Sequence, residues 1–162
     1  MYIGNHQAAL SVSYLSSLGI THLLNCAHPG PEAAMSVEVD QQQLRQADIE
    51  YLGLQLADES QQEIAPVFSR SGDWINAALA GPQHRVLVNC WAGISRSATV
   101  TLAFLVSIQR HVTLTSDIII SQMRHRSMSL VQAIREVKST RDISPNRGFL
   151  KQLVEYENKF SG

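Results

Sequence analysis

Short apolar runs typical of strands alternate along this chain with longer stretches in which apolar residues recur at helical spacing. Strand character is found in residues 1–4, 20–26, 49–56 and 85–90. Helical spacing or helix-start signals are found in residues 5–18, 40–46, 63–79, 129–140, and onward from 96 and from 144. Interleaved strands and helices predict an α/β domain, with a central, mostly parallel sheet of four to five strands flanked by helices.

Several polar residues mark where the expected helices begin and end. Asn5 is a candidate cap for a single helix that runs to about Leu18, where Gly19 would end it. Ser129 is suited to cap the helix that follows it. The pair Ser144-Pro145 is expected to cap and start the last helix.

Composition and charge narrow the classes of protein to consider. A chain of 162 residues predicts one domain that is large enough to bury a core. The net charge of −1 argues against a nucleic-acid partner. Without an apolar run of membrane-spanning length or a signal peptide, we expect no membrane partner and a cytoplasmic location, with the nucleus as a second compartment. The oligomeric state is not indicated.

Cysteine and histidine usage gives no sign of a disulfide framework or a metal site. Two cysteines are too few for a framework in a chain of this length. The six histidines show no paired ligand spacing. We therefore expect neither a metal nor another cofactor.

The segment from Arg85 to Thr99 is the strongest candidate for a catalytic site. An apolar strand delivers Cys90, a turn containing Gly93 follows, and Arg96 opens an apolar helix. Five residues between cysteine and arginine allow the backbone N–H groups to curl inward as a nest for an anion, and the helix N-terminus adds about half a positive charge. The predicted phosphate-binding residues are Trp91, Ala92, Gly93, Ile94, Ser95 and Arg96.

Within this nest, Cys90 would lie beneath the phosphorus as a nucleophile. A free thiol has a pKa of about 8.5, so it is mostly protonated at neutral pH. Positive charge nearby would lower this pKa and make the thiolate abundant. The amides, the helix N-terminus and the planar fork of Arg96 would supply that charge. Ser97 can donate a hydrogen bond to the sulfur when the thiolate leaves.

Residues 88–99, Val-Asn-Cys-Trp-Ala-Gly-Ile-Ser-Arg-Ser-Ala-Thr, resemble the active-site loop of the cysteine-dependent protein phosphatases, specifically the small atypical dual-specificity phosphatases. Tyr-Ile-Gly-Asn near the start, Leu-Gly-Ile-Thr-His-Leu-Leu-Asn after it, and Pro-Asn-Arg-Gly-Phe-Leu near the end also resemble segments of that domain. The resemblance implies a protein tyrosine phosphatase-like fold of the dual-specificity type. It also implies a phosphocysteine intermediate and phosphorylated proteins as substrates, at phosphotyrosine and at phosphoserine or phosphothreonine.

Attack on phosphorus requires a proton donor for the leaving oxygen. Asp58 is the candidate because it follows a predicted strand and lies 32 residues before Cys90 (90 − 58 = 32), where the family places its general acid. The adjacent Glu59 is a less favoured alternative, and an ordinary solvated loop carboxylate is the non-catalytic alternative.

Two departures from the family pattern bear on activity. Asn89 stands where the family usually has histidine; its amide can hydrogen-bond a neighbouring backbone group but cannot become charged. Residues 107–128 contain what we interpret as an insertion, either an added interaction surface or a segment with no selected role. Together they motivate an alternative function, a catalytically weak or inactive pseudophosphatase that binds phosphorylated groups. A lipid or RNA phosphate substrate is a weaker alternative, since the loop has no lysine.

Cys26 ends a strand expected to neighbour the loop strand. Some phosphatases of this superfamily carry a second cysteine at a similar position that forms a protective disulfide with the nucleophile. The resemblance therefore implies a reversible Cys26–Cys90 bond, and a buried, inert cysteine is the alternative.

Overall fold

A four-stranded parallel sheet forms the centre of the molecule. The computed structural model describes residues 1–31, 34–107 and 128–159. The strands are β1 (Tyr2–Gly4), β2 (His22–Asn25), β3 (Glu50–Gly53) and β4 (Val86–Asn89). They lie in the order β1-β4-β2-β3, and every neighbouring pair is parallel. The predicted α/β class with a mostly parallel sheet is therefore confirmed, and the described residues form four strands where four to five were expected.

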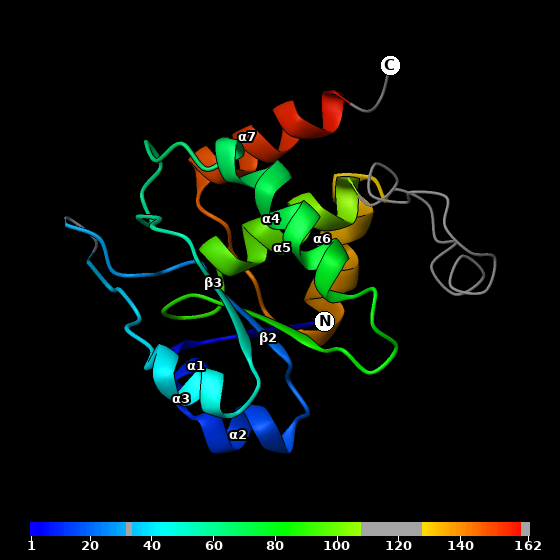
Figure 1. Ribbon diagram of the computed structural model, residues 1–162. Helices are drawn as coiled ribbons and strands as arrows, with labels where there is room; N and C mark the ends of the chain where they lie inside the picture. The colour runs from blue at the N-terminus through cyan, green and yellow to red at the C-terminus, as the bar shows by residue number, and fades with distance from the viewer. Residues whose placement is uncertain (32–33, 108–127, 160–162) are drawn as a thin grey trace.

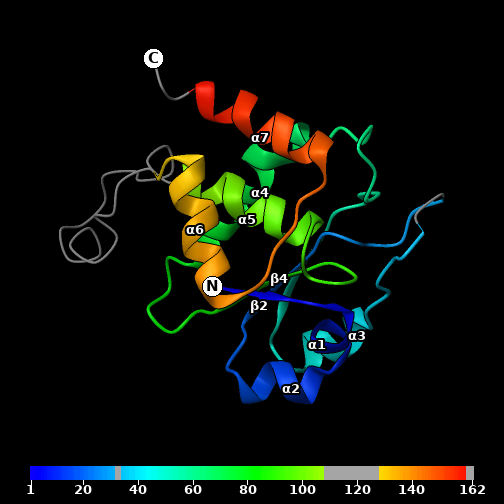
Figure 2. The same ribbon diagram turned by 180° about the vertical axis from the view of Figure 1, so that it is seen from behind.

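Helices cover both faces of this sheet. They are α1 (His6–Leu10), α2 (Val12–Ser17), α3 (Gln41–Gln46), α4 (Ala65–Ala78), α5 (Arg96–Ser107), α6 (Leu130–Thr140) and α7 (Arg147–Asn158). In the two opposite views of Figures 1 and 2, α4 to α7 lie on one side of the sheet and α1 to α3 on the other. The arrangement has three layers, with the sheet between two layers of helices.

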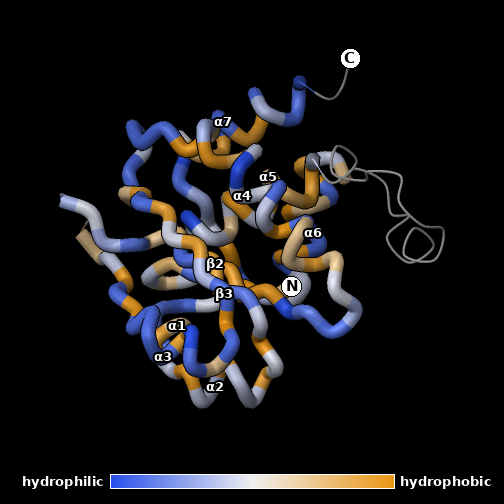
Figure 3. The backbone as a smooth tube through the Cα atoms, viewed as in Figure 1, coloured by the Kyte–Doolittle hydropathy of each residue, from blue (hydrophilic) through white to orange (hydrophobic). Residues whose placement is uncertain are grey.

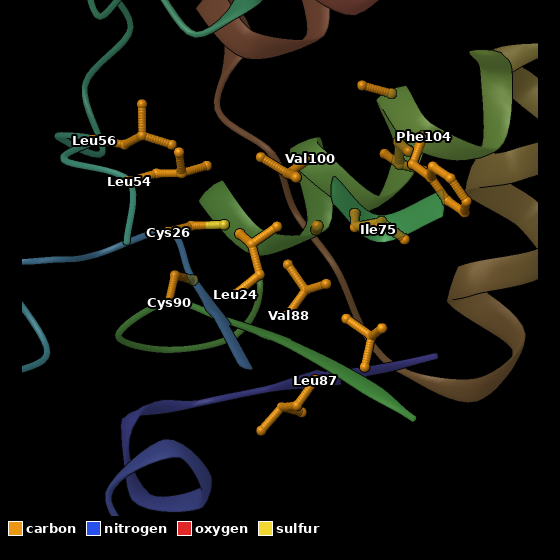
Figure 4. Close-up of a cluster of buried hydrophobic side chains, with 14 of the residues drawn as sticks. Leu24, Cys26, Leu54, Leu56, Ile75, Leu87, Val88, Cys90, Val100 and Phe104 are labelled. Atoms are coloured by element: carbon orange, nitrogen blue, oxygen red, sulfur yellow. The ribbon is translucent and has the colours of Figure 1, made fainter. Parts of the chain in front are cut away.

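The helix α5 is the centre of the larger helical layer. Of its residues only Leu105 is not fully buried, because the helix packs against α4, α6, α7 and the sheet. The helix suits this position because all its residues after Arg96 are apolar or are small serines and threonines, with no charged residue among them. Figure 3 shows the hydrophobic colouring concentrated along the strands and inner helices, and Figure 4 shows Val88, Val100 and Phe104 in this core. The loop between β4 and α5 is therefore anchored at both ends in the core.

The predicted helix over residues 5–18 was wrong in one respect, since the structure has two helices there. Asn5 caps α1 as expected, its side chain accepting a hydrogen bond from Ala8 N. At Ser11, however, the backbone is extended and the hydroxyl accepts a hydrogen bond from Tyr14 N, which starts α2. A serine hydroxyl offers the backbone this alternative to continuing a helix. Gly19 follows with a φ of +66°, consistent with the predicted stop.

The predicted start of the last helix was also wrong. Asn146, not Ser144, caps α7, and its side chain accepts a hydrogen bond from Phe149 N. The backbone N–H of Ser144 instead donates to Ile94 O in the loop after β4. Ser129 does cap α6, in a capping box with Gln132.

The predicted insertion, residues 107–128, lies outside the described residues except at its two ends, so it stays a prediction. Within the ranges that the structure describes, no helix combines the length and apolar character needed to cross a bilayer.

Candidate active site

Cys90 lies at the carboxyl edge of the sheet, directly after β4. In the strand register Asn89 is paired with Gly4 of β1 and with Asn25 of β2, so the cysteine lies at the centre of that edge. Ligand sites of parallel α/β sheets form outside the carboxyl ends of the strands. The loop of residues 90–95 and the first turn of α5 complete the site.

The Cys90 thiol is buried, with 1% of the residue exposed, and receives several hydrogen bonds. Gly93 N donates to its Sγ at 3.2 Å and Ser97 Oγ at 3.3 Å. Burial acts to raise the pKa of the thiol, but the hydrogen bonds from Ser97 and Gly93 and the charge of Arg96 outweigh it, so the pKa is lowered from its ordinary value. The site therefore stabilises the thiolate, the nucleophilic form, relative to an ordinary cysteine.

Glycine is required at position 93 for two reasons. Its φ is +74°, a conformation that other residues rarely adopt. A Cβ atom there would lie 2.5 Å from Gly4 O, which belongs to β1. The loop thus turns tightly against the neighbouring strand.

The guanidinium of Arg96 is buried and already held in place. Nη1 donates to Leu56 O at 3.0 Å and Nη2 to Met35 O at 3.3 Å. The third guanidinium nitrogen, Nε, has no hydrogen-bond partner among the described residues, and it lies 3.7 Å from Asp58 Oδ2. Buried donors without partners are rare, so this N–H is available for an anion.

The predicted acid, Asp58, lies beside the same loop. Its Oδ1 accepts hydrogen bonds from Ser95 Oγ at 2.6 Å and from Asn146 Nδ2 at 3.0 Å. The loop after β3 and the start of α7 therefore place this carboxyl next to the nest. The adjacent Glu59 is exposed, and its backbone carbonyl accepts from Gln62 N in a turn.

Among the described residues, the Asn89 amide donates to another side chain and not to a backbone group. Its Nδ2 donates to Asn25 Oδ1 at 3.1 Å, because the two asparagines are paired across neighbouring strands. Asn25 in turn donates to Val37 O and to Tyr51 Oη. A buried, uncharged network therefore replaces the ring that the family usually has at position 89.

Cys26 follows Asn25 just as Cys90 follows Asn89, and Cys26 N donates to Asn89 O at 2.8 Å. Figure 4 shows the two cysteines next to each other. Both are free thiols. Burial and the nearby Cys90 raise the pKa of the Cys26 thiol, and Arg96 offsets this only in part. The environment therefore favours the protonated thiol at Cys26, whereas it lowers the pKa of the Cys90 thiol.

Sequence reasoning missed the residues that hold the loop from outside. His6, Arg141 and Ser144 bond to its carbonyl groups, and Asn146 bonds to Asp58. The segment Pro-Asn-Arg-Gly-Phe-Leu contains one of them, Asn146, and was the available signal. Nothing in the local pattern marks His6 or Arg141.

Comparisons with known proteins agree with this geometry. Residues 1–121 match the family described as "Dual specificity phosphatase, catalytic domain". The chain is 34% identical over 163 residues to dual specificity protein phosphatase 26 of Bos taurus, covering 98% of this chain and 64% of that protein. It is 35% identical over 159 residues to dual specificity protein phosphatase 13B of Homo sapiens, covering 98% of this chain and 70% of that protein.

The fold comparison gives the same result. The crystal structure of human DUSP28 superposes with a TM-score of 0.72 at 25% identity, covering 99% of this chain and 92% of that one. This chain spans less than two thirds of the length of the bovine relative. The predicted fold type and the predicted resemblance are both confirmed, and the chain belongs to the dual specificity phosphatase catalytic-domain family.

Proposed function

We propose that this protein hydrolyses phosphotyrosine and phosphoserine or phosphothreonine in proteins through a phosphocysteine intermediate. The observation that carries the proposal is the environment of Cys90 Sγ. This atom accepts hydrogen bonds from Gly93 N and Ser97 Oγ at the base of a nest of backbone amides, with Arg96 beside it. A lowered thiol pKa inside an anion-binding loop suits nucleophilic attack on phosphorus.

In the first step, Cys90 Sγ forms a bond to phosphorus while the bond from phosphorus to the substrate oxygen breaks. Asp58 gives a proton to that leaving oxygen. The position of Asp58, held by Ser95 and Asn146 next to the loop, supports this role. The products of the step are the dephosphorylated side chain and phosphocysteine.

In the second step, a water molecule attacks phosphorus and gives its proton to Asp58, and the phosphorus–sulfur bond breaks. Ser97 Oγ then donates to the thiolate that leaves, which is the atom it already contacts. The amides of residues 91–96 and the guanidinium of Arg96 stabilise the charge on the phosphoryl oxygens in both steps. The Nε–H of Arg96, which has no hydrogen-bond partner among the described residues although it lies 3.7 Å from Asp58 Oδ2, supports this assignment.

Cys26 belongs to the proposal as a redox partner of Cys90. Its position supports the pairing, because Cys26 and Cys90 directly follow Asn25 and Asn89, the last paired residues of β2 and β4. Neighbouring parallel strands lie about 4.8 Å apart, and disulfides join Cα atoms about 4.4–6.8 Å apart. We further propose a single catalytic domain, with residues 107–128 as an insertion, acting in the cytoplasm or the nucleus.

The test is hydrolysis of an aryl phosphate, and of peptides carrying phosphotyrosine or phosphothreonine, between pH 5 and pH 8. The wild type is expected to hydrolyse all three, and Cys90→Ser to hydrolyse none. Cys90→Ser should still bind the phosphopeptides, because the loop amides and Arg96 are unchanged. A wild type that folds and binds phosphopeptides without hydrolysing them would replace this proposal with the pseudophosphatase.

A further inference from the structure

The outer side of the phosphate loop is held by residues that the proposed chemistry does not use. Trp91 O accepts two hydrogen bonds from His6, one from the backbone N and one from Nδ1, both at 2.9 Å. Because a carbonyl can only accept, Nδ1 of His6 carries the proton. The ring of His6 also stacks on that of Trp91, with centroids 4.4 Å apart and planes at 12°. One residue of α1 therefore fixes both the backbone and the side chain of Trp91.

Arg141, at the end of α6, holds the next two carbonyls. Its Nε donates to Gly93 O at 2.8 Å and its Nη2 to Ala92 O at 3.3 Å. The following carbonyl, Ile94 O, accepts from Ser144 N at 2.8 Å. Four consecutive carbonyl groups thus face outward onto partners from α1, from the end of α6 and from the segment after it.

Outward carbonyls determine where the amides face. In a planar trans peptide the C=O and the next N–H point in opposite directions. The peptide between Ala92 and Gly93 shows this directly, since its carbonyl bonds to Arg141 and its N–H bonds to Cys90 Sγ. The same relation turns the N–H groups of Ala92, Ile94 and Ser95 toward the inside of the loop.

We propose that His6 and Arg141 are positioning residues for oxyanion binding. By holding the outer carbonyls they keep the inner N–H groups aimed at the phosphoryl oxygens and at the Cys90 thiolate. Arg141 uses two donors of one planar guanidinium to hold two successive carbonyls, Ala92 O and Gly93 O. A lysine cannot reproduce this arrangement. The inference rests on the proposed function in taking the oxyanion to be a phosphoryl group.

The test compares Arg141→Lys, Arg141→Met and His6→Phe, with Arg135→Met as a control at an exposed position of the same helix. Lysine keeps the charge at position 141 but loses the fork, and phenylalanine keeps a ring against Trp91 but loses the Nδ1 donor. All are made in a Cys26→Ser background so that one thiol remains. The measurements are the pH profile of alkylation by iodoacetamide and the protection from alkylation by inorganic phosphate, neither of which requires turnover.

Both Arg141 variants are expected to move the alkylation profile to higher pH and to weaken phosphate protection by roughly tenfold, since the hydrogen bonds from the charged guanidinium that orient the loop amides are lost. His6→Phe should weaken protection less, because the backbone N–H of residue 6 still bonds to Trp91 O. Arg135→Met should match the parent. Circular dichroism at the assay temperature verifies that each variant is folded.

Two results would overturn the inference. Parent-like behaviour of Arg141→Lys would mean that charge alone acts at position 141. Parent-like phosphate protection in Arg141→Met and His6→Phe would mean that the loop keeps its shape without these bonds. A parent that binds phosphate but hydrolyses no phosphopeptide would refute the proposed function and leave the positioning roles standing.

Discussion

Ser97 Oγ donates a hydrogen bond to Cys90 Sγ at 3.3 Å, so the second residue of α5 stabilises the thiolate at the end of β4. This bond is the largest of the influences that lower the pKa of Cys90 against the effect of burial. Ser97→Ala is therefore expected to raise the thiol pKa and to move the rising limb of the pH–activity profile to higher pH. The breakdown of phosphocysteine should slow by roughly tenfold or more, because a hydrogen bond to a charged group contributes about 1.5–3 kcal/mol.

Steady-state and burst kinetics from pH 5 to pH 8 measure both effects. The matched control is Ser139→Ala, which removes a hydroxyl that donates to Glu136 O within α6. An unchanged profile in Ser97→Ala would show that the amides and Arg96 activate the thiol without this hydroxyl.

Asp58→Asn is expected to lower hydrolysis by about 10²–10⁴-fold for substrates whose leaving oxygen needs a proton, the usual range for general acid catalysis. The loss should shrink for aryl phosphates with strongly acidic phenols, since those oxygens leave without protonation. The asparagine keeps an oxygen for the bonds from Ser95 and Asn146, so the loop should stay in place. Rates for a series of aryl phosphates measure this dependence.

Glu59→Gln serves as the control for the acid assignment. Its side chain is exposed, and we expect rates equal to those of the wild type across the series. A loss in Glu59→Gln that depends on the leaving group, without one in Asp58→Asn, would move the acid role to the neighbouring residue.

Oxidation should distinguish the two interpretations of Cys26. Peroxide oxidises the Cys90 thiolate to a sulfenic acid, and the Cys26 thiol then displaces water to form a disulfide. The raised pKa of Cys26 means that Cys90 reacts first. We expect activity lost to peroxide to return with dithiothreitol in the wild type but to return poorly in Cys26→Ser, where overoxidation is irreversible. Peptide mass spectrometry that finds no Cys26–Cys90 cross-link would leave Cys26 as an inert core residue.

Local signals in the sequence predicted the parts of the site whose residues are close together in the chain, whereas Asp58 and Cys26, which lie far from the loop in sequence, were predicted from the resemblance to the family. Cys90, Arg96 and Ser97 meet because a strand, a short loop and a helix start follow one another, and each step has a local signal. His6 and Arg141 could not be predicted, since their contacts with the loop join residues far apart in the chain and depend on how α1 and α6 pack.

The helix boundaries were wrong for a related reason. A serine or asparagine in a helical pattern can either continue a helix or cap the next one. At Ser11 the bonds that accompany the break are local, to Ser13 and Tyr14, whereas at Asn146 a tertiary contact accompanies the cap. Ser11 ends one helix and caps another, and Asn146 caps α7 while its Nδ2 donates to Asp58.

The Asn25 side chain makes several hydrogen bonds at the carboxyl edge of the sheet, next to Cys90. It donates to Val37 O at 2.7 Å and to Tyr51 Oη at 3.2 Å, and it accepts from Ala27 N at 3.0 Å and Asn89 Nδ2 at 3.1 Å. Because most of these groups are buried, removing the amide would leave them without partners. Asn25→Ala is therefore expected to lower the free energy of unfolding by about 2–4 kcal/mol.

Urea unfolding measures this cost, and Asn5→Ala provides the comparison. Asn5 makes one capping bond, to Ala8 N, at a helix start, and its loss should cost only about 1 kcal/mol. Asn25→Asp separates hydrogen bonding from lost volume, since aspartate keeps the shape but sets an acceptor against Val37 O. We expect it to be destabilised as well. Equal costs for Asn25→Ala and Asn5→Ala, or a stable Asn25→Asp, would show that this network does not hold the strands behind Cys90.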